Sequence, residues 1–293
     1  MTFEFATATR IVFGPGTFQQ VGPIAKSLGR RALVVTGKSP ARAERLRVQL
    51  NAVGVATESF AFAGEPTTHA VTEGVALARA AGCDCVIAFG GGSAIDGAKA
   101  IAGLLTNAGE LHDYLKVIGR AQPLVQPAAP FLAIPTTAGT GAEVTRNAVL
   151  ASPEQRVKAS LRSPHLLPRV ALVDSELTHD LPPALTASTG LDALTQCLEP
   201  YVCCAPNPMT DALALEGLRR AGRSLRAVYA DGKNLAARED LTVSDYVHIL
   251  GQSQPRVSRH LKLLVEAGLL ERTREGANTW FALPPADTAA GSL

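Results

Sequence analysis

The sequence predicts an α/β fold in which a parallel sheet of buried strands is followed by a helical region. Short apolar runs such as Arg31–Thr36 and Phe131–Pro135 are typical of strands buried on both faces. Helical periodicity between such runs, as in residues 71–79, indicates strand–helix–strand units. Strands that alternate with helices form parallel sheets, whose ligands bind at the carboxyl ends of the strands. After about Asp174 the pattern becomes helical, beginning at the proline pair 182–183.

The composition is that of a globular protein. Of the 293 residues 46% are hydrophobic and 18% are charged, which excludes a disordered chain, and the formal net charge of +2 favours no class of partner. No apolar run reaches the length of about eighteen residues that a membrane span needs. The first seven residues alternate like a strand and lack the layout of a signal peptide, and the five cysteines have no disulfide-framework spacing. We therefore expect a cytoplasmic protein that does not contact membranes.

The expected elements follow one another through the first half of the chain. The strand at Arg31–Thr36 leads into a helix at Pro40–Leu50. A further run at Thr57–Phe62 leads into the turn Gly64–Thr67, after which helical periodicity resumes. These units precede the most informative stretch of the chain.

That stretch is the junction 86–99, where an apolar run rich in strand formers meets Gly90, Gly91 and Gly92 and a helical pattern starts at once. Glycines let backbone N–H groups approach a pyrophosphate, and the N-terminus of the next helix adds unpaired donors and a positive dipole. The junction therefore predicts a phosphate cradle in a Rossmann-like domain. An ordinary tight turn between a strand and a helix is the alternative, because glycine fingerprints are individually weak.

Hydroxyl groups and glycines follow the strand Phe131–Pro135, in the segment Thr136–Thr145. By itself this segment is only a polar loop. Because it lies at the same edge of the predicted sheet as the glycine junction, it favours a site for the ribose, phosphate or amide of a nucleotide.

A pair of oxygen donors comes later in the chain. Asp192 and Gln196 are four residues apart, so a helix places them one above the other on one face. Two such oxygens can begin a divalent metal site, and the ion can polarise a carbonyl or alkoxide oxygen. A solvated helix face gives the same pattern.

Together these segments resemble the iron-containing (group III) alcohol dehydrogenase family, whose fold is similar to that of dehydroquinate synthase. Its recurrent motifs occur here in matching order: Gly-Gly-Gly-Ser-x-x-Asp at 90–96, Pro-Thr-Thr-Ala-Gly-Thr-Gly-x-Glu at 135–143 and Gly-x-Asp-Ala-Leu-Thr at 190–195. The resemblance runs from about Phe3 to about Tyr229. It implies hydride transfer between NAD(P) and a small alcohol or aldehyde, and we expect a homo-oligomer.

The resemblance also implies a cofactor site. Its residues are Gly90, Gly91, Gly92, Ser93 and Asp96 at the pyrophosphate, Thr136, Thr137 and Thr140 on the nicotinamide side, and Lys158 near the ribose. Family members commonly carry an acidic residue after the first Val-Val-Thr strand, where it contacts the adenosine 2′-hydroxyl. Gly37 stands there in this sequence, followed by Lys38. Loss of the carboxylate and gain of a cation make room for a 2′-phosphate, which favours NADP over NAD.

Two departures from the family concern the metal. The family pairs an aspartate with a histidine where this chain has Asp192 and Gln196. An amide oxygen is a poorer ligand for iron or zinc than imidazole, although a subset of the family shares this feature. The further histidines of the family's helical domain have no counterpart here. We therefore expect the site for Fe or Zn to be weak or absent, with Asp192 as the remaining catalytic and metal-binding residue.

The C-terminal part resembles the winged-helix domain of ArsR-type repressors. Residues 241–264 show two short helices around a glycine-containing turn, which is a helix-turn-helix pattern, and residues 268–283 are typical of a hairpin. The helices that precede this unit in the repressors are missing. The residues placed for contact with DNA bases and phosphates are Gln254, Arg256, Ser258, Arg259 and His260.

The sequence thus predicts three parts: a dinucleotide-binding α/β domain at 1–178, a truncated helical domain at 179–234, and a partial winged helix-turn-helix with its tail at 235–293. The main hypothesis is an NAD(P)-dependent alcohol or aldehyde oxidoreductase with an incomplete metal site. Two alternatives stay open. One is a nucleotide-binding, ArsR-like regulator that binds DNA, and the other is a chimeric reading frame with no efficient activity or only a promiscuous one.

Overall fold

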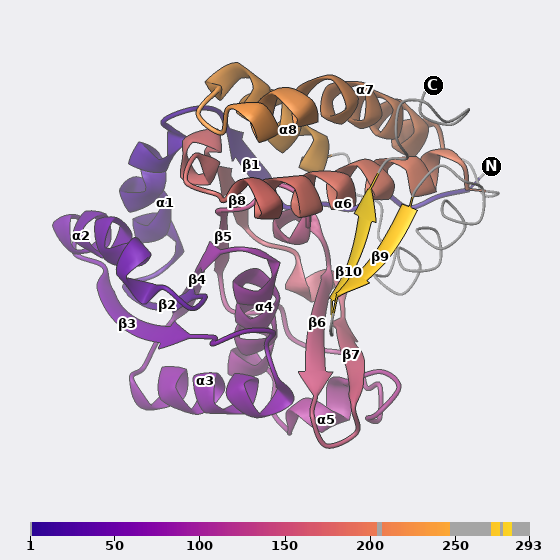
Figure 1. Ribbon diagram of the computed structural model, residues 1–293. Helices are drawn as coiled ribbons and strands as arrows, with labels where there is room; N and C mark the ends of the chain where they lie inside the picture. The colour runs from indigo at the N-terminus through magenta and orange to yellow at the C-terminus, as the bar shows by residue number, and fades with distance from the viewer. Residues whose placement is uncertain (1, 204–206, 247–270, 276–277, 283–293) are drawn as a thin grey trace.

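A parallel sheet of six strands forms the centre of the first part of the chain (Figure 1). The computed structural model describes residues 2–203, 207–246, 271–275 and 278–282. The strand order is β1-β8-β5-β4-β2-β3, and every neighbouring pair is parallel. The strands are β1 (Arg10–Phe13), β2 (Arg31–Thr36), β3 (Ala56–Ala61), β4 (Cys85–Gly90), β5 (Phe131–Pro135) and β8 (Val170–Val173).

The predicted α/β architecture is confirmed, and β2 and β5 have the bounds that the apolar runs predict. The alternation of the first seven residues indicates a strand, and this indication is wrong. Residues 2–7 form no strand, because pairing of the N-terminal segment with β8 begins only at Arg10, opposite Val170. An alternating pattern becomes a strand only where a neighbour accepts its backbone hydrogen bonds.

Helices cover both faces of the sheet. Side chains alternate along β2, so that Leu33 and Val35 join one core cluster while Ala32 and Val34 join another. The first cluster packs α3 (Thr68–Ala80) and α4 (Gly92–Thr106) on the sheet, and the second packs α1 (Val21–Leu28) and α2 (Glu44–Ala52). The 3₁₀ turns η1 (Thr17–Gln20) and η2 (Pro40–Ala43) precede α1 and α2.

The two ends of this domain are joined by Asp174, which is buried at the end of β8. Its carboxylate accepts hydrogen bonds from the backbone N–H groups of Gly16 at 3.1 Å and Phe18 at 2.9 Å. It also accepts one from Glu176 at 3.0 Å, as the N-cap of the 3₁₀ turn η5 (Ser175–Thr178). The chain segment after β1 is therefore tied directly to the segment after β8.

A two-stranded hairpin was not anticipated from the sequence. Strands β6 (Asn147–Ser152) and β7 (Val157–Arg162) pair antiparallel, and their apolar side chains pack on α4. Shorter elements surround this hairpin: α5 (Leu111–Tyr114), η3 (Ala142–Val144) and η4 (Pro164–Leu166).

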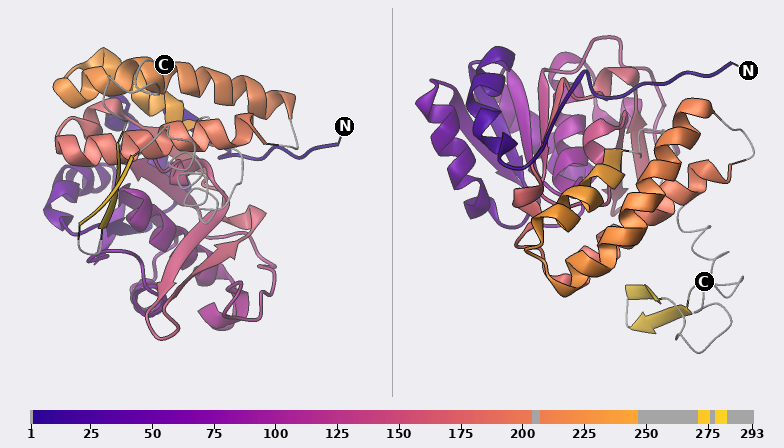
Figure 2. Two further views of the ribbon diagram at one scale, coloured as in Figure 1. Left: turned by 45° about the vertical axis from the view of Figure 1, so that its right-hand side comes forward. Right: turned by 90° about the horizontal axis from the view of Figure 1, so that it is seen from above.

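Three helices follow the α/β domain, and Figures 1 and 2 show them side by side at one end of the molecule. They are α6 (Pro183–Tyr201), α7 (Pro208–Ala230) and α8 (Leu235–Tyr246). Ala237 and Leu241 of α8 pack with Ala221 and Val228 of α7 in a small apolar cluster. The expected boundary at 234/235 coincides with the start of α8, and the division into three parts stays a prediction.

The last described elements are β9 (Glu271–Glu275) and β10 (Asn278–Ala282), which pair antiparallel. They confirm the hairpin predicted over 268–283. The predicted helix-turn-helix lies largely in residues that the structure does not describe. The residues predicted to contact DNA also lie outside the described part of the chain: Gln254, Arg256, Ser258, Arg259 and His260. Among the described helices none has the length and apolar character needed to cross a membrane.

Candidate functional site

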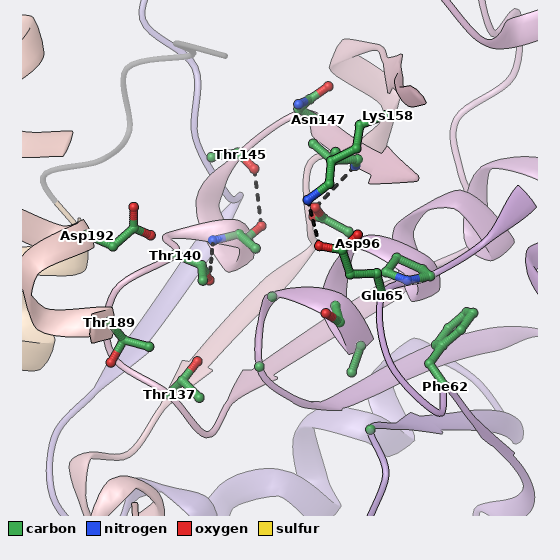
Figure 3. A pocket seen from close by; sticks show the side chains of 18 of the residues that line it. Phe62, Glu65, Asp96, Thr137, Thr140, Thr145, Asn147, Lys158, Thr189 and Asp192 are labelled. Carbon is green, nitrogen blue, oxygen red and sulfur yellow. Dashed lines mark hydrogen bonds and ion pairs between the residues drawn. The ribbon is translucent and has the colours of Figure 1, made fainter. Parts of the chain in front are cut away.

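A pocket of about 670 Å³ lies where the glycine junction, the hydroxyl-rich loop and α6 meet (Figure 3). Most of the predicted site residues line it. These are Gly37, Lys38, Gly91, Gly92, Ser93, Asp96, Thr137, Thr140, Lys158, Asp192 and Gln196. Segments that the sequence places far apart therefore surround one cavity.

The glycine junction forms one wall of the pocket. Gly91 is the N-cap residue of α4 and has no side chain to bond the first N–H groups of the helix. A Cβ on Gly91 would lie 3.2 Å from the Thr137 side chain, and one on Gly92 would lie 3.0 Å from that of Thr140. Glycine thus keeps this wall open, and the helix N-terminus presents N–H donors and a positive dipole to an anion.

The hydroxyl-rich loop after β5 forms the neighbouring wall. The Thr137 Oγ1 atom is buried without a hydrogen-bond partner, which suits a site whose ligand supplies the partner. Thr136 and Gly90 do not line the pocket. The Thr136 N–H donates to the Gly90 carbonyl at 3.0 Å, so these two residues join the ends of β5 and β4 behind the pocket.

Gly37 and Lys38 lie at the end of β2, beside the glycine junction. A Cβ added at Gly37 would meet no heavy atom within 4 Å, so there is free space at this position. The Lys38 side chain is exposed and pairs with no carboxylate in the described part of the chain. Space and an unpaired cation at this place suit an additional phosphate group.

Two charged residues of the predicted cofactor site are held by ion pairs. Lys158 on β7 contacts Glu65 at 2.6 Å, and both side chains are about half exposed, at 50% and 58% (Figure 3). Such a pair is worth little in water, so an incoming ligand can replace it. Asp96 on α4 pairs with Lys99 at 3.2 Å, so the negative charge of this carboxylate beside the cradle is compensated.

Helix α6 supplies the wall opposite the cradle, and Thr189 and Asp192 on it face the hydroxyl-rich loop (Figure 3). The Gln196 amide nitrogen donates to Asp192 Oδ2 at 2.8 Å and to the Gly139 carbonyl at 3.2 Å. Burial raises the pKa of Asp192 to about 6, and the hydrogen bond from Gln196 opposes this increase. The predicted placement of Asp192 and Gln196 on one helix face is confirmed.

These residues do not fit an iron or zinc site. Both hydrogen bonds use the amide N–H₂ of Gln196 as donor, so the group directs protons, and not a lone pair, toward Asp192. Iron and zinc need several nitrogen, sulfur or carboxylate ligands together. Within the residues that the structure describes, no three His, Cys, Asp or Glu side chains are grouped to hold an ion.

Several lining residues were missed by sequence reasoning. They are Phe62, Arg146, Asn147, Val149, Arg162, Leu185, Thr189 and Glu199. Thr189 and Glu199 could have been found, because they continue the spacing of Asp192 and Gln196 along one helix face. The residues of the β6–β7 hairpin had no comparable signal, since their position depends on a strand pairing that the sequence does not show.

Two family models match the chain. Iron-containing alcohol dehydrogenase matches residues 8–175, and the C-terminal model of the Fe-containing alcohol dehydrogenase family matches residues 186–259. The second match covers part of the segment 241–264, whose sequence pattern predicts a helix-turn-helix. It gives no support to a fusion with a winged-helix domain.

Individual proteins of this family are also similar to the chain. Alcohol dehydrogenase 4 of Saccharomyces cerevisiae (strain YJM789) is 38% identical over 240 residues, which are 80% of this chain and 62% of the yeast protein. Sulfoacetaldehyde reductase of Bilophila wadsworthia (strain 3_1_6) is 34% identical over 273 residues, which are 87% of this chain and 70% of that protein.

The fold is likewise similar to solved structures. One is sulfoacetaldehyde reductase from Bifidobacterium kashiwanohense in complex with NAD+, with a TM-score of 0.79 and 31% identity over 85% of this chain and 66% of that one. The chain thus spans less than two thirds of the length of this protein and of the yeast enzyme. The first family model alone matches more than half of the residues. The chain therefore belongs to the iron-containing alcohol dehydrogenase family.

Proposed function

We propose that this chain binds NADP(H) in the pocket and acts as an oxidoreductase on small alcohols or aldehydes. One observation carries the proposal: an open glycine wall, a buried unpartnered threonine hydroxyl and an acidic helix face surround a single cavity. A family of alcohol dehydrogenases supplies the reaction class.

The cofactor extends across the pocket in this proposal. Its adenosine end lies by Gly37 and Lys38, and its diphosphate lies at Gly91 and Gly92. The preference for NADP rests on the Lys38 ammonium, because opposite charges attract a 2′-phosphate that NAD lacks. The diphosphate position rests on the unbonded N–H groups at the start of α4.

Thr137 and Thr140 would hold the nicotinamide end, and the substrate would bind between this end and α6. When bound, the cofactor would supply the redox chemistry: NADP+ would take a hydride from the alcohol carbon while the hydroxyl proton leaves to solvent, and NADPH would return a hydride to the aldehyde carbon, whose oxygen takes up a proton. The chain positions both molecules, and Asp192 is the acidic side chain at this end of the pocket. The described residues offer no complete metal site, so we assign no step to a metal.

The substrate class rests on relatives. The yeast relative is named an alcohol dehydrogenase, and the two reductases are named for sulfoacetaldehyde, a small aldehyde. We extend this class to the present chain because its pocket walls come from the matched residues. A homo-oligomer and a cytoplasmic location remain expectations.

The DNA-binding alternative has less support. Its contact residues lie outside the described part of the chain, and the C-terminal dehydrogenase model reaches residue 259. A chimeric reading frame without efficient turnover differs from the main proposal in activity, not in cofactor binding. One experiment therefore separates the active oxidoreductase from the inactive chimera.

The experiment is a fluorescence titration with NADPH and with NADH, followed by aldehyde reduction with and without added Fe²⁺ or Zn²⁺. Gly91→Val is the matched variant, because its side chain would fill the glycine wall and meet Thr137. We expect NADPH to bind the parent more tightly than NADH, and Gly91→Val to abolish binding. Absence of binding to the parent would overturn the proposal, whereas binding without reduction of any aldehyde would support the inactive chimera.

A further inference from the structure

Lys99 is a fully buried lysine in the middle of α4. Its side chain has no exposed surface, and it lies between alanines in a helix whose other buried residues are apolar or glycine. Burial lowers the pKa of Lys99 below its ordinary value, and the nearby Asp96 carboxylate opposes this decrease only in part. An ammonium group removed from water is unfavourable unless its N–H groups meet acceptors.

Four acceptors surround the Lys99 Nζ atom. The Asn147 carbonyl lies at 2.5 Å, the Thr145 hydroxyl at 3.0 Å and the Thr145 carbonyl at 3.3 Å. The Asp96 carboxylate lies at 3.2 Å. Three of these contacts go to the short segment that leads from the hydroxyl-rich loop into β6, 46 to 48 residues away in the sequence.

A second contact joins the same two elements. The other oxygen of Asp96 accepts a hydrogen bond from the Val149 N–H at 3.1 Å. Asp96 is thus held by Lys99 on one side and by β6 on the other. The segment is consequently fixed to α4 at every second residue, through Thr145, Asn147 and Val149.

Both elements belong to the pocket. Helix α4 begins at the glycine wall, and Thr145, Asn147 and Val149 line the cavity. Because a helix is rigid over seven residues, the Lys99 contacts set the distance between the glycine wall and the β6 wall. The buried Glu143 carboxyl in η3 also faces this cluster, since the Lys99 and Asp96 charges act on it.

We propose that Lys99 is a positioning residue that fixes the width of the cofactor pocket by holding the Thr145–Val149 segment against α4. It touches neither cofactor nor substrate in this proposal, and it acts through the backbone of β6. The inference rests on the proposed function, because the pocket is the one we assign to NADP(H).

The test compares Lys99→Met with Arg79→Met. Arg79 is a suitable control because it also joins two elements through main-chain carbonyls, those of Leu104 at 2.6 Å and Asn107 at 3.5 Å. These contacts lie at the far end of α4 and outside the pocket. Both variants lose a cation that donates to backbone carbonyls, but only Lys99→Met is expected to change the pocket.

Two readouts are measured at a temperature where circular dichroism shows folded protein. We expect Lys99→Met to raise the NADPH dissociation constant by about tenfold and Arg79→Met to leave it within about twofold, since charged hydrogen bonds are among the strong ones. We also expect faster hydrogen exchange of residues 143–152 in Lys99→Met alone. Lys99→Gln keeps an N–H donor without a buried charge. It should partly restore both the affinity for NADPH and the slow hydrogen exchange of residues 143–152.

Tight NADPH binding by Lys99→Met would overturn the proposal, even if its melting temperature fell as far as that of Arg79→Met. Should Lys99→Met not fold, Lys99→Gln carries the test, and normal NADPH affinity there would equally contradict it. If the parent binds neither NADPH nor NADH, the proposed function fails. Exchange in residues 143–152 then still decides whether Lys99 holds β6.

Discussion

The contact between the hydroxyl-rich loop and α6 leads to a sharp prediction about Gly139. This residue has φ of 150°, a conformation that side chains rarely adopt. A Cβ placed on it would lie 2.2 Å from the Thr189 carbonyl oxygen, which belongs to the backbone of α6. Gly139→Ala must therefore strain the loop and displace the helix that carries Asp192.

The magnitude follows from two contributions. The backbone conformation costs about 1–3 kcal/mol for a residue with a side chain. The overlap with a helix backbone, which cannot rotate away, adds about 1–3 kcal/mol. We therefore expect Gly139→Ala to lower the free energy of unfolding by about 2–6 kcal/mol.

Gly54→Ala is the control that separates these contributions. Gly54 also has a positive φ, of 79°, but a Cβ there would meet no heavy atom within 4 Å. It should lose only the conformational part, about 1–3 kcal/mol. The assay is urea unfolding of both variants, followed by NADPH titration and aldehyde reduction.

Gly139→Ala should also reduce turnover, because a displaced α6 moves Asp192 relative to Thr137. Affinity for NADPH should fall less, since Lys38 and the glycine wall lie elsewhere in the pocket. Equal unfolding free energies for Gly139→Ala and Gly54→Ala, within about 0.5 kcal/mol, would refute the close approach of the loop to α6.

Three further predictions concern charge. Lys38→Glu should raise the dissociation constant of NADPH about tenfold but change that of NADH little, in the same fluorescence titration, because only NADPH carries a 2′-phosphate. Burial raises the pKa of Glu143 to about 7, so its contribution to stability is full below pH 4.5 and is lost as the pH rises through 7. Glu143→Gln should therefore remove a stability decrease of up to about 3 kcal/mol between pH 4.5 and 7, and an unchanged pH profile in urea unfolding would contradict this. Treatment with EDTA should leave the NADPH dissociation constant within about twofold, since the described cradle contains no group of metal ligands.

Much of the fold could be predicted because its signals are local. The bounds of β2 and β5 follow from uninterrupted apolar runs, and the turn from β4 into α4 follows from three glycines. The shared face of Asp192 and Gln196 follows from helix geometry alone. Each of these inferences needs only neighbours within a few positions of the sequence.

The rest depends on contacts between distant segments. Nothing local distinguishes the polar strand β7 from a loop, and its pairing with β6 buries only alternate residues. The Lys158–Glu65 ion pair joins residues 93 positions apart. The role of Lys99 could not be predicted, because a lysine in a helix is ordinarily exposed to solvent. The acceptors that allow its burial belong to the segment that leads into β6, far from α4 in the sequence.

The pairing of β1 with β8 sets an order in time for biosynthesis. The Asp174 carboxylate accepts a hydrogen bond from the Phe18 backbone N–H, 156 residues earlier in the sequence. Strand β1 is therefore synthesised first of the six strands of the sheet, and its partner β8 is synthesised last. At about 5–20 residues per second this interval is on the order of ten to thirty seconds. During it, β1 lacks β8, the strand with which it pairs in the sheet. Slow translation between residues 20 and 170 should thus increase the demand for chaperones, while a faster ribosome should shorten this vulnerable period.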